Sequence, residues 1–134
     1  MRKRRKRSQR QILHDKAWEI QSIYIRQSGG EYTQCYTCLK SYHWKLLQAG
    51  HWKHGICDFE SWNIRPQCVQ CNRWMSGMRD TFMRNLQREY GVEQLDRLEA
   101  EGQKRGNRYS VEELEKIIRV YKGKLDKLST TQFV

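Results

Sequence analysis

Two pairs of cysteines constrain this 134-residue chain more than any other feature of its sequence. Cys35 and Cys38 form one CxxC pair and Cys68 and Cys71 form a second, with 29 residues between the pairs. Four thiolates complete a closed tetrahedral shell around one structural Zn²⁺ ion. A simple zinc ribbon has roughly 15–20 residues between its pairs. The longer insert must therefore hold structure of its own, and a hairpin would satisfy that requirement.

The rest of the cysteine pattern and the composition agree with a metal site. Hydrophobic residues make up 37% of the chain, which is a lean core that a metal ion would help to stabilise. Redox-active CxxC pairs are the alternative, but the βαβ pattern of a thioredoxin-like motif is missing. We expect the chain in a reducing cytoplasm, where disulfides are disfavoured and CxxC pairs usually serve metal binding or redox chemistry. The fifth cysteine, Cys57, is expected to be a half-buried thiol or a surface residue.

The charge of the chain points to a polyanionic partner. The formal net charge is +11, and six positive charges lie in one basic arm. The arm consists of Arg2, Lys3, Arg4, Arg5, Lys6 and Arg7. Such clusters bind phosphate backbones by releasing counterions. We favour nucleic acid over an anionic membrane, because no large amphipathic apolar face adjoins the arm. No apolar run reaches the roughly 20 residues that span a bilayer, and the arm lacks the apolar region of a signal peptide.

Periodicity and turn residues predict an α+β chain. Helices are expected at 12–27, from about Cys68 with continuation at 78–90, at 92–101 and at 110–128. The last begins with a capping box formed by Ser110 and Glu113. Strands are expected at 46–52, ending at His51, and at 59–64, closed by Pro66. The predicted organisation is a flexible basic arm (1–11), an N-terminal helix (12–30), a zinc-bound core (31–91) and a C-terminal helical extension (92–134).

Polar residues suited to phosphodiester hydrolysis lie between and just after the cysteine pairs. His51 can activate water, because the pKa of histidine lies near neutrality. Asn63 in the return strand can hold the hairpin and orient His51 by hydrogen bonds. Asn72 directly follows Cys71 and offers an amide oxygen to a Mg²⁺ ion. A lone histidine in a strand is usually structural or exposed, but this order of residues between two CxxC pairs is much rarer by chance.

The arrangement resembles the HNH, or ββα-metal, nucleases in their HNN variant, which have a treble-clef-like zinc-stapled core. The segments around His51, Asn63 and Asn72 resemble more narrowly the phage NinG/Rap recombination proteins. These segments read Gln-Ala-Gly-His, Asn-Ile-Arg-Pro-Gln-Cys and Cys-Asn-Arg-x-x-Ser-Gly. The CxxC-Asn ending is also similar to the junction resolvase endonuclease VII. The likeness covers about residues 33–98, roughly half the chain.

The resemblance implies a role for each matching residue. His51 would be the general base, Asn63 would constrain the loop and orient His51, and Asn72 would bind a catalytic Mg²⁺ or Mn²⁺ ion. The four paired cysteines would hold structural zinc, and Arg73 would contact phosphate.

The chain departs from the HNH pattern at Gly50, where most of these nucleases have an aspartate ligand before the histidine. The ion must then take its ligands from Asn72, substrate phosphate, water and some other group of the protein. The candidates are His51 itself, His54, Asp58, Glu60 and Asp80.

The sequence therefore predicts an endonuclease of phage recombination, acting in the host cytoplasm on branched DNA such as Holliday junctions and D-loops. Some of the tryptophans around the motif could stack on unpaired bases, although at least two are expected in the core. Cutting opposite strands is easiest with two active sites, so a homodimer is a further hypothesis. The alternatives are a zinc-stapled DNA-binding protein without catalysis and an HNH endonuclease of homing or restriction type.

Overall fold

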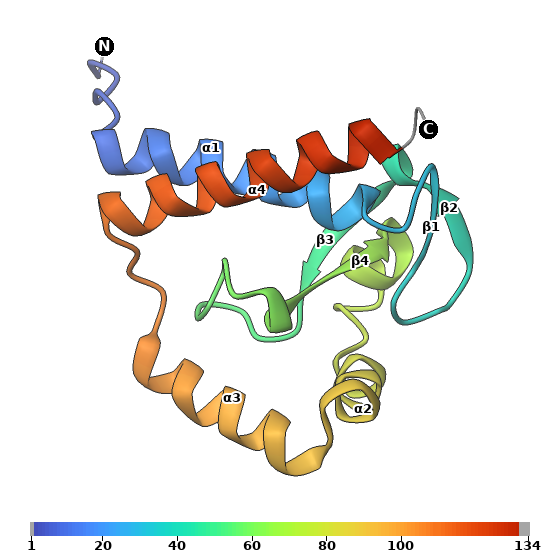
Figure 1. Cartoon of the computed structure of the whole chain (residues 1–134). Coiled ribbons are helices and arrows are strands. Elements are labelled where there is room, and N and C mark those ends of the chain that lie inside the picture. Colours follow the sequence, from blue (N-terminus) through green and yellow to red (C-terminus); the bar gives the residue numbers. More distant parts are fainter. Residues whose placement is uncertain (1, 132–134) are drawn as a thin grey trace. The chain divides into compact units, whose positions relative to one another are not determined.

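The computed structural model describes residues 2–131 and shows helices combined with two small antiparallel sheets (Figure 1). The helices are α1 (Gln9–Gln27), α2 (Arg79–Tyr90), α3 (Val92–Arg105) and α4 (Val111–Thr131). The strands are β1 (Tyr32–Gln34), β2 (Ser41–His43), β3 (Leu47–His51) and β4 (Ile64–Cys68). Strand β1 pairs with β2, and β3 pairs with β4. The predicted α+β class is confirmed at this level.

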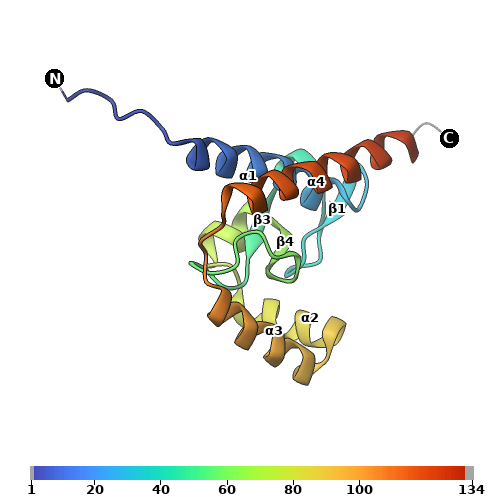
Figure 2. The ribbon, with the colours of Figure 1, turned by 60° about the vertical axis from the view of Figure 1, so that its left-hand side comes forward.

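The chain divides into two compact units. One contains residues up to 21 together with those from 109 onward, and the other contains residues 22–108. In the first unit the N-terminal part of α1 lies beside α4, as Figure 1 and Figure 2 show. Among the described side chains of α4, the buried ones are Leu114, Ile118 and Tyr121, whose spacing of four and three places them on one helical face.

Capping boxes set the starts of α1 and α4. Ser8 Oγ accepts from the Gln11 N–H at 3.2 Å, and Gln11 Oε1 accepts from the Ser8 N–H at 2.9 Å. Helix α1 therefore begins at Gln9, three residues before the predicted start. The predicted box at Ser110 and Glu113 is confirmed by reciprocal bonds of 3.1 and 3.2 Å.

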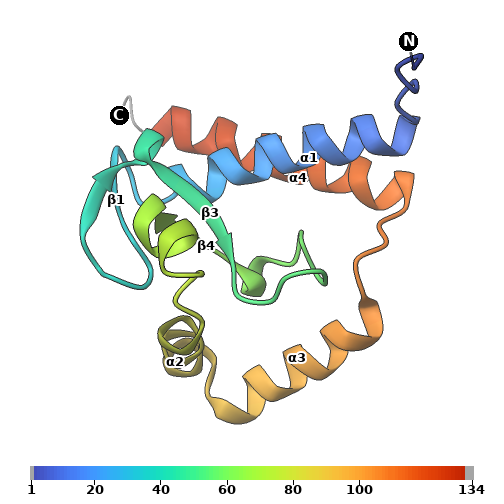
Figure 3. The same ribbon diagram turned by 180° about the vertical axis from the view of Figure 1, so that it is seen from behind.

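The hairpin of β3 and β4 forms the centre of the second unit, and Figure 3 shows the two strands side by side. Leu47 lies opposite Cys68 and His51 lies opposite Ile64. The return strand was predicted at 59–64 but begins at Ile64, because turns occupy the preceding residues. Pro66 does not close this strand but pairs with Ala49 within it. The Pro66 carbonyl points away from β3 and accepts from the Tyr36 N–H at 2.8 Å. In an antiparallel pair the N–H of a residue points to the same side as its carbonyl, so the N–H that proline lacks would not have bonded to β3.

The helix predicted from about Cys68 begins slightly later and is short. Strand β4 runs through Cys68, and a single π-helical turn, Gln70–Trp74, follows it. Met78 has a left-handed backbone (φ 50°) immediately before α2. This conformation separates the π-helical turn from α2, so the two cannot form one continuous helix.

Helices α2 and α3 pack against each other and cover the main apolar core of the second unit. Its buried members are Trp52, Cys57, Trp62, Phe82, Leu86 and Leu95. Cys57 is fully buried, contrary to prediction, and its Sγ lies 3.5 Å from the Gly102 carbonyl. A Cβ on Gly102 would lie 3.0 Å from both Cys57 and Trp62, so α3 approaches this core through a residue without a side chain. No helix within residues 2–131 is long and apolar enough to cross a membrane.

Candidate metal centre and active site

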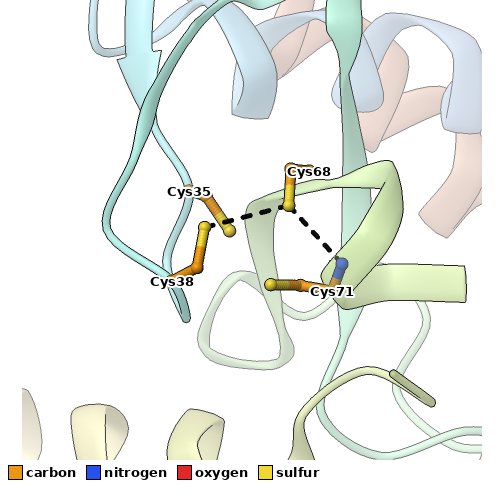
Figure 4. Close-up of side chains that lie close together, drawn as sticks. All are labelled: Cys35, Cys38, Cys68 and Cys71. Atoms are coloured by element: carbon orange, nitrogen blue, oxygen red, sulfur yellow. Dashed lines mark hydrogen bonds between the residues drawn. The ribbon is translucent and has the colours of Figure 1, made fainter. Parts of the chain in front are cut away.

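The four cysteines of the two CxxC pairs converge on one point, as Figure 4 shows. Their sulfur atoms all lie within 4.8 Å of one another, and Cys38 Sγ is 3.9 Å from Cys68 Sγ. A tetrahedral Zn²⁺ ion with bonds of about 2.3 Å separates its sulfur ligands by roughly 3.8 Å. A disulfide would need about 2.05 Å. The geometry fits four ligands around one metal ion.

Backbone turns shape each half of this cluster. In the first pair, the Cys35 N–H donates to the Lys40 carbonyl at 2.8 Å, and the Leu39 N–H donates to the Cys35 carbonyl at 3.0 Å. Leu39 takes a left-handed conformation (φ 66°) to close this turn. In the second pair, the Cys71 N–H points to Cys68 Sγ at 3.4 Å. Both turns are local, so sequence spacing alone is enough to bring each pair together.

The electrostatics of the cluster favour a cation. Burial opposes ionisation of Cys35, but hydrogen bonds from the Cys38 and Cys68 backbone N–H groups lower its pKa to about 6. Burial raises the pKa of Cys71 to about 12 and also raises the pKa of Cys38. Four adjacent thiols cannot all ionise unaided, whereas a bound metal ion deprotonates its thiol ligands. The four cysteines can thus hold a structural metal such as zinc.

His51 ends β3 and is fixed through one ring nitrogen. Its Nε2 lies 2.9 Å from the Asp58 carbonyl oxygen. A carbonyl only accepts, so Nε2 carries the proton and the ring is basic at Nδ1. The imidazole is largely enclosed, with 15% of the side chain exposed. This tautomer and setting suit a group that accepts a proton.

Asn63 is fully buried and binds the loop that leads to Asp58. Its Oδ1 accepts from the Lys53 N–H at 2.7 Å. Its Nδ2 lies 2.9 Å from the Lys53 carbonyl, 3.2 Å from that of Ile56 and 3.3 Å from that of Cys57. One side chain therefore ties together both ends of the loop that places a carbonyl against His51.

A second asparagine, Asn107, also binds this loop. It lies just after the end of α3, and it was not among the residues predicted from the sequence. Asn107 Oδ1 accepts from the Asp58 N–H at 3.0 Å, and Asn107 Nδ2 donates to Asp58 Oδ2 at 2.9 Å. The two residues are 49 positions apart, so no local motif could have revealed the contact.

Replacing Asn63 with alanine should lower the free energy of unfolding by about 3 kcal/mol, because several buried backbone groups would lose their partner. Urea denaturation followed by tryptophan fluorescence measures this change. Asn107→Ala is the matched control, since its contacts are exposed, and it should cost clearly less. Equal stability of Asn63→Ala and wild type would refute the proposed loop-holding role.

Asn72 lies in the π-helical turn directly after Cys71 of the cysteine cluster. Its Nδ2 donates to Gln48 Oε1 at 2.8 Å, which places the side chain against β3. Its Oδ1 would lie 3.1 Å from a Cβ on Gly50. The fold thus brings Asn72 to the residue that precedes His51.

The other predicted ligands of a catalytic ion do not form a cluster with one another in the part of the chain that the structure describes. Within residues 2–131, the four cysteines form the only group of three or more His, Cys, Asp or Glu side chains that converges. Asp58 Oδ1 is 4.0 Å from His51 Nε2, and Glu60 pairs with Arg105 at 3.6 Å. The His54 ring centre is 6.2 Å from that of His51, and Asp80 lies in the first turn of α2.

The candidate DNA-binding residues are exposed. The basic arm precedes α1 as exposed chain, and Arg7 pairs with Asp15 at 2.7 Å. Arg73 is also exposed, on the π-helical turn beside Asn72. Among the tryptophans, Trp52 and Trp62 are buried in the core, whereas 78% of Trp74 is exposed. The expectation that at least two tryptophans belong to the core is confirmed.

A family model described as the bacteriophage lambda NinG protein matches residues 1–131. No curated protein and no solved structure matches the chain.

Proposed function

The protein belongs to the NinG family, because the family model matches residues 1–131, and we propose a function for it on this basis. In this proposal the protein is a metal-dependent, structure-selective DNA endonuclease of phage recombination. The observation that carries the proposal is the setting of His51. Its Nε2 is held by the Asp58 carbonyl, and a Cβ on the preceding residue, Gly50, would lie 3.1 Å from Asn72 Oδ1. His51 is thus the residue of β3 next to the one that faces Asn72, and Asn72 directly follows a cysteine of the cluster.

In the proposed reaction, His51 takes a proton from water at Nδ1 as the water oxygen bonds to the scissile phosphorus. A bridging P–O bond of the DNA backbone breaks, and the departing sugar oxygen takes a proton from solvent. The bond from Nε2 to the Asp58 carbonyl holds the ring in the required tautomer, and Asn63 holds the loop that supplies this carbonyl. Asn72 contributes an amide oxygen to a Mg²⁺ or Mn²⁺ ion. Such an ion stabilises negative charge that develops on the phosphate. The cysteine cluster holds Cys71, and with it the neighbouring Asn72, next to β3.

Binding to DNA would be mainly electrostatic. The arm at Arg2–Arg7 and the exposed Arg73 would contact phosphates, which position a protein without reading sequence. Trp74 offers an exposed ring on which an unpaired base at a branch point could stack. A homodimer that cuts both strands of a junction stays a prediction.

The alternative from another class is a zinc-stapled DNA-binding protein without catalysis. It would use the same arm and cysteines but would not need His51 or Asn72. An HNH endonuclease of homing or restriction type would cut linear duplex in a sequence-dependent way.

The proposal is tested with labelled four-way junctions, D-loops, flaps and linear duplexes of matched sequence, with and without Mg²⁺ or Mn²⁺. We expect ion-dependent cutting of the branched substrates and much slower cutting of the duplex. Cutting of all substrates at one rate would remove the branched-DNA claim. Lack of cutting with either ion would leave only the DNA-binding alternative.

A further inference from the structure

Gly50 leaves no space for the acidic side chain that HNH nucleases usually carry at this position. A Cβ on Gly50 would lie 1.9 Å from Gln67 Oε1 and 2.8 Å from Gln67 Cδ, well inside contact distance. Gln67 lies opposite Gln48 in the hairpin, so its side chain projects on the same face as Gly50. The amide of Gln67 therefore occupies the volume that a side chain at position 50 would fill.

The amide of Gln67 is buried and oriented. Its Nε2 donates to the Gly77 carbonyl at 2.9 Å and to Thr37 Oγ1 at 3.2 Å. The Gly77 oxygen can only accept, which fixes the nitrogen on that side and the oxygen toward Gly50. The whole residue is 0% exposed.

The oxygen of this amide lacks a partner. Among the described residues, Gln67 Oε1 is one of the buried side-chain atoms that accepts no hydrogen bond. A buried acceptor without a donor is unfavourable and rare, so such an atom calls for a ligand or a functional role. An oxygen held in place by two bonds through its own nitrogen is well suited to bind a cation.

A second amide oxygen lies at the same place. Asn72 Oδ1 is 3.1 Å from the position that a Cβ on Gly50 would take, and Gln67 Oε1 is 1.9 Å from that position. Two oxygens around one point match the ligand type that Mg²⁺ and Mn²⁺ select. They come from β4 and from the π-helical turn, which the cysteine cluster joins.

We propose that Gln67 Oε1 replaces the acidic ligand missing at Gly50 and binds, together with Asn72 Oδ1, the divalent ion of the nuclease site. The proposal rests on the proposed function for the identity of the ion, but it assigns a ligand by geometry alone. Both ligands are neutral, so the ion should bind more weakly than at a site with a carboxylate. The competing explanation is that Gln67 only braces Thr37 and Gly77 next to the cysteine cluster.

Manganese binding to the zinc-loaded protein tests the proposal without DNA and without catalysis. The loss of the free Mn²⁺ signal in electron paramagnetic resonance gives the affinity, and oxygen-seeking Mn²⁺ should leave the thiolate site untouched. Gln67→Glu should bind Mn²⁺ at least about tenfold more tightly than wild type, because the ion then meets a carboxylate. Gln70→Glu is the matched control: it adds the same charge at an exposed position of the adjoining turn and should leave the affinity unchanged.

A swap of the two positions gives a second test. Gln67→Ala alone should weaken Mn²⁺ binding at least about tenfold. Adding Gly50→Asp to Gln67→Ala fills the vacated space with a carboxylate and should restore binding. The proposal is overturned if Gln67→Ala binds Mn²⁺ like wild type, or if Gln67→Glu tightens binding no more than Gln70→Glu.

The outcomes separate this proposal from the proposed function. Tighter Mn²⁺ binding by Gln67→Glu in a protein that cuts no DNA would support the ligand and refute the nuclease. If the protein cuts junctions but substitutions at Gln67 leave its Mn²⁺ affinity unchanged, the nuclease function is supported and the role of Gln67 as a ligand is refuted.

Discussion

Substitution of His51 by alanine should slow single-turnover cleavage of a four-way junction by about 10²–10⁴-fold, the contribution of a positioned general base. The imidazole is fixed by the Asp58 carbonyl so that Nδ1 is the basic nitrogen. Alanine removes this base but leaves the arm and the cysteine cluster in place. Junction binding, measured by gel shift without divalent ions, should therefore stay close to wild type.

His14→Ala is the matched control for this substitution. His14 lies on α1 with 45% of its side chain exposed, and it belongs to the other compact unit. Its loss should leave the cleavage rate within about twofold of wild type, which is near the limit for a surface change. Equal cleavage by His51→Ala and His14→Ala would contradict the assignment of His51 as the base.

The second large effect is expected at the cysteine cluster. Structural zinc contributes an apparent 10–16 kcal/mol in small zinc domains, more than the roughly 5–15 kcal/mol that stabilises a typical protein. Cys71→Ser should therefore abolish stoichiometric zinc and unfold the hairpin and π-helical turn that the cluster joins. Zinc content by mass spectrometry and the loss of near-UV circular dichroism would measure both effects.

Cys57→Ser makes the same chemical change outside the cluster. Cys57 is buried in the main core and contacts Gly102, so this variant should lose about 1–3 kcal/mol of stability but keep its zinc. If Cys71→Ser retained zinc and wild-type unfolding, the cluster would not be a structural metal site. If both variants lost zinc equally, the effect would be one of general destabilisation.

Features formed by residues that are close together in the sequence could be predicted. The CxxC turns involve residues only three apart, and the Ser110–Glu113 box is equally local, so spacing alone indicates both. The box at Ser8 and Gln11 is just as local, but the run of basic residues before it suggested an unstructured arm.

Features made by contacts between distant segments could not be predicted. The burial of Cys57 depends on the approach of α3 at Gly102, 45 residues away in sequence. The start of β4 at Ile64 depends on the tight loop that Asn63 binds, because this loop and its turns occupy the residues before Ile64.

The candidate active site shows both cases. His51, Asn63 and Asn72 can be selected from their order relative to the cysteines, and the structure places Asn72 beside the residue that precedes His51. The sequence shows that an acid is missing at Gly50 but not what occupies its space. Only packing reveals Gln67 there, because a buried glutamine in a short strand carries no sequence signal for ion binding.

The central claim is that the segment held by the cysteine cluster cuts DNA rather than only binding it. The most direct test is an order-of-addition experiment with a labelled four-way junction. Zinc-loaded wild-type protein is first bound to the junction without Mg²⁺ or Mn²⁺, and Mn²⁺ is then added to the preformed complex. The nuclease account predicts an intact junction before the addition and paired cuts near the branch point after it. A stable complex whose DNA stays intact after Mn²⁺ is added would contradict the account.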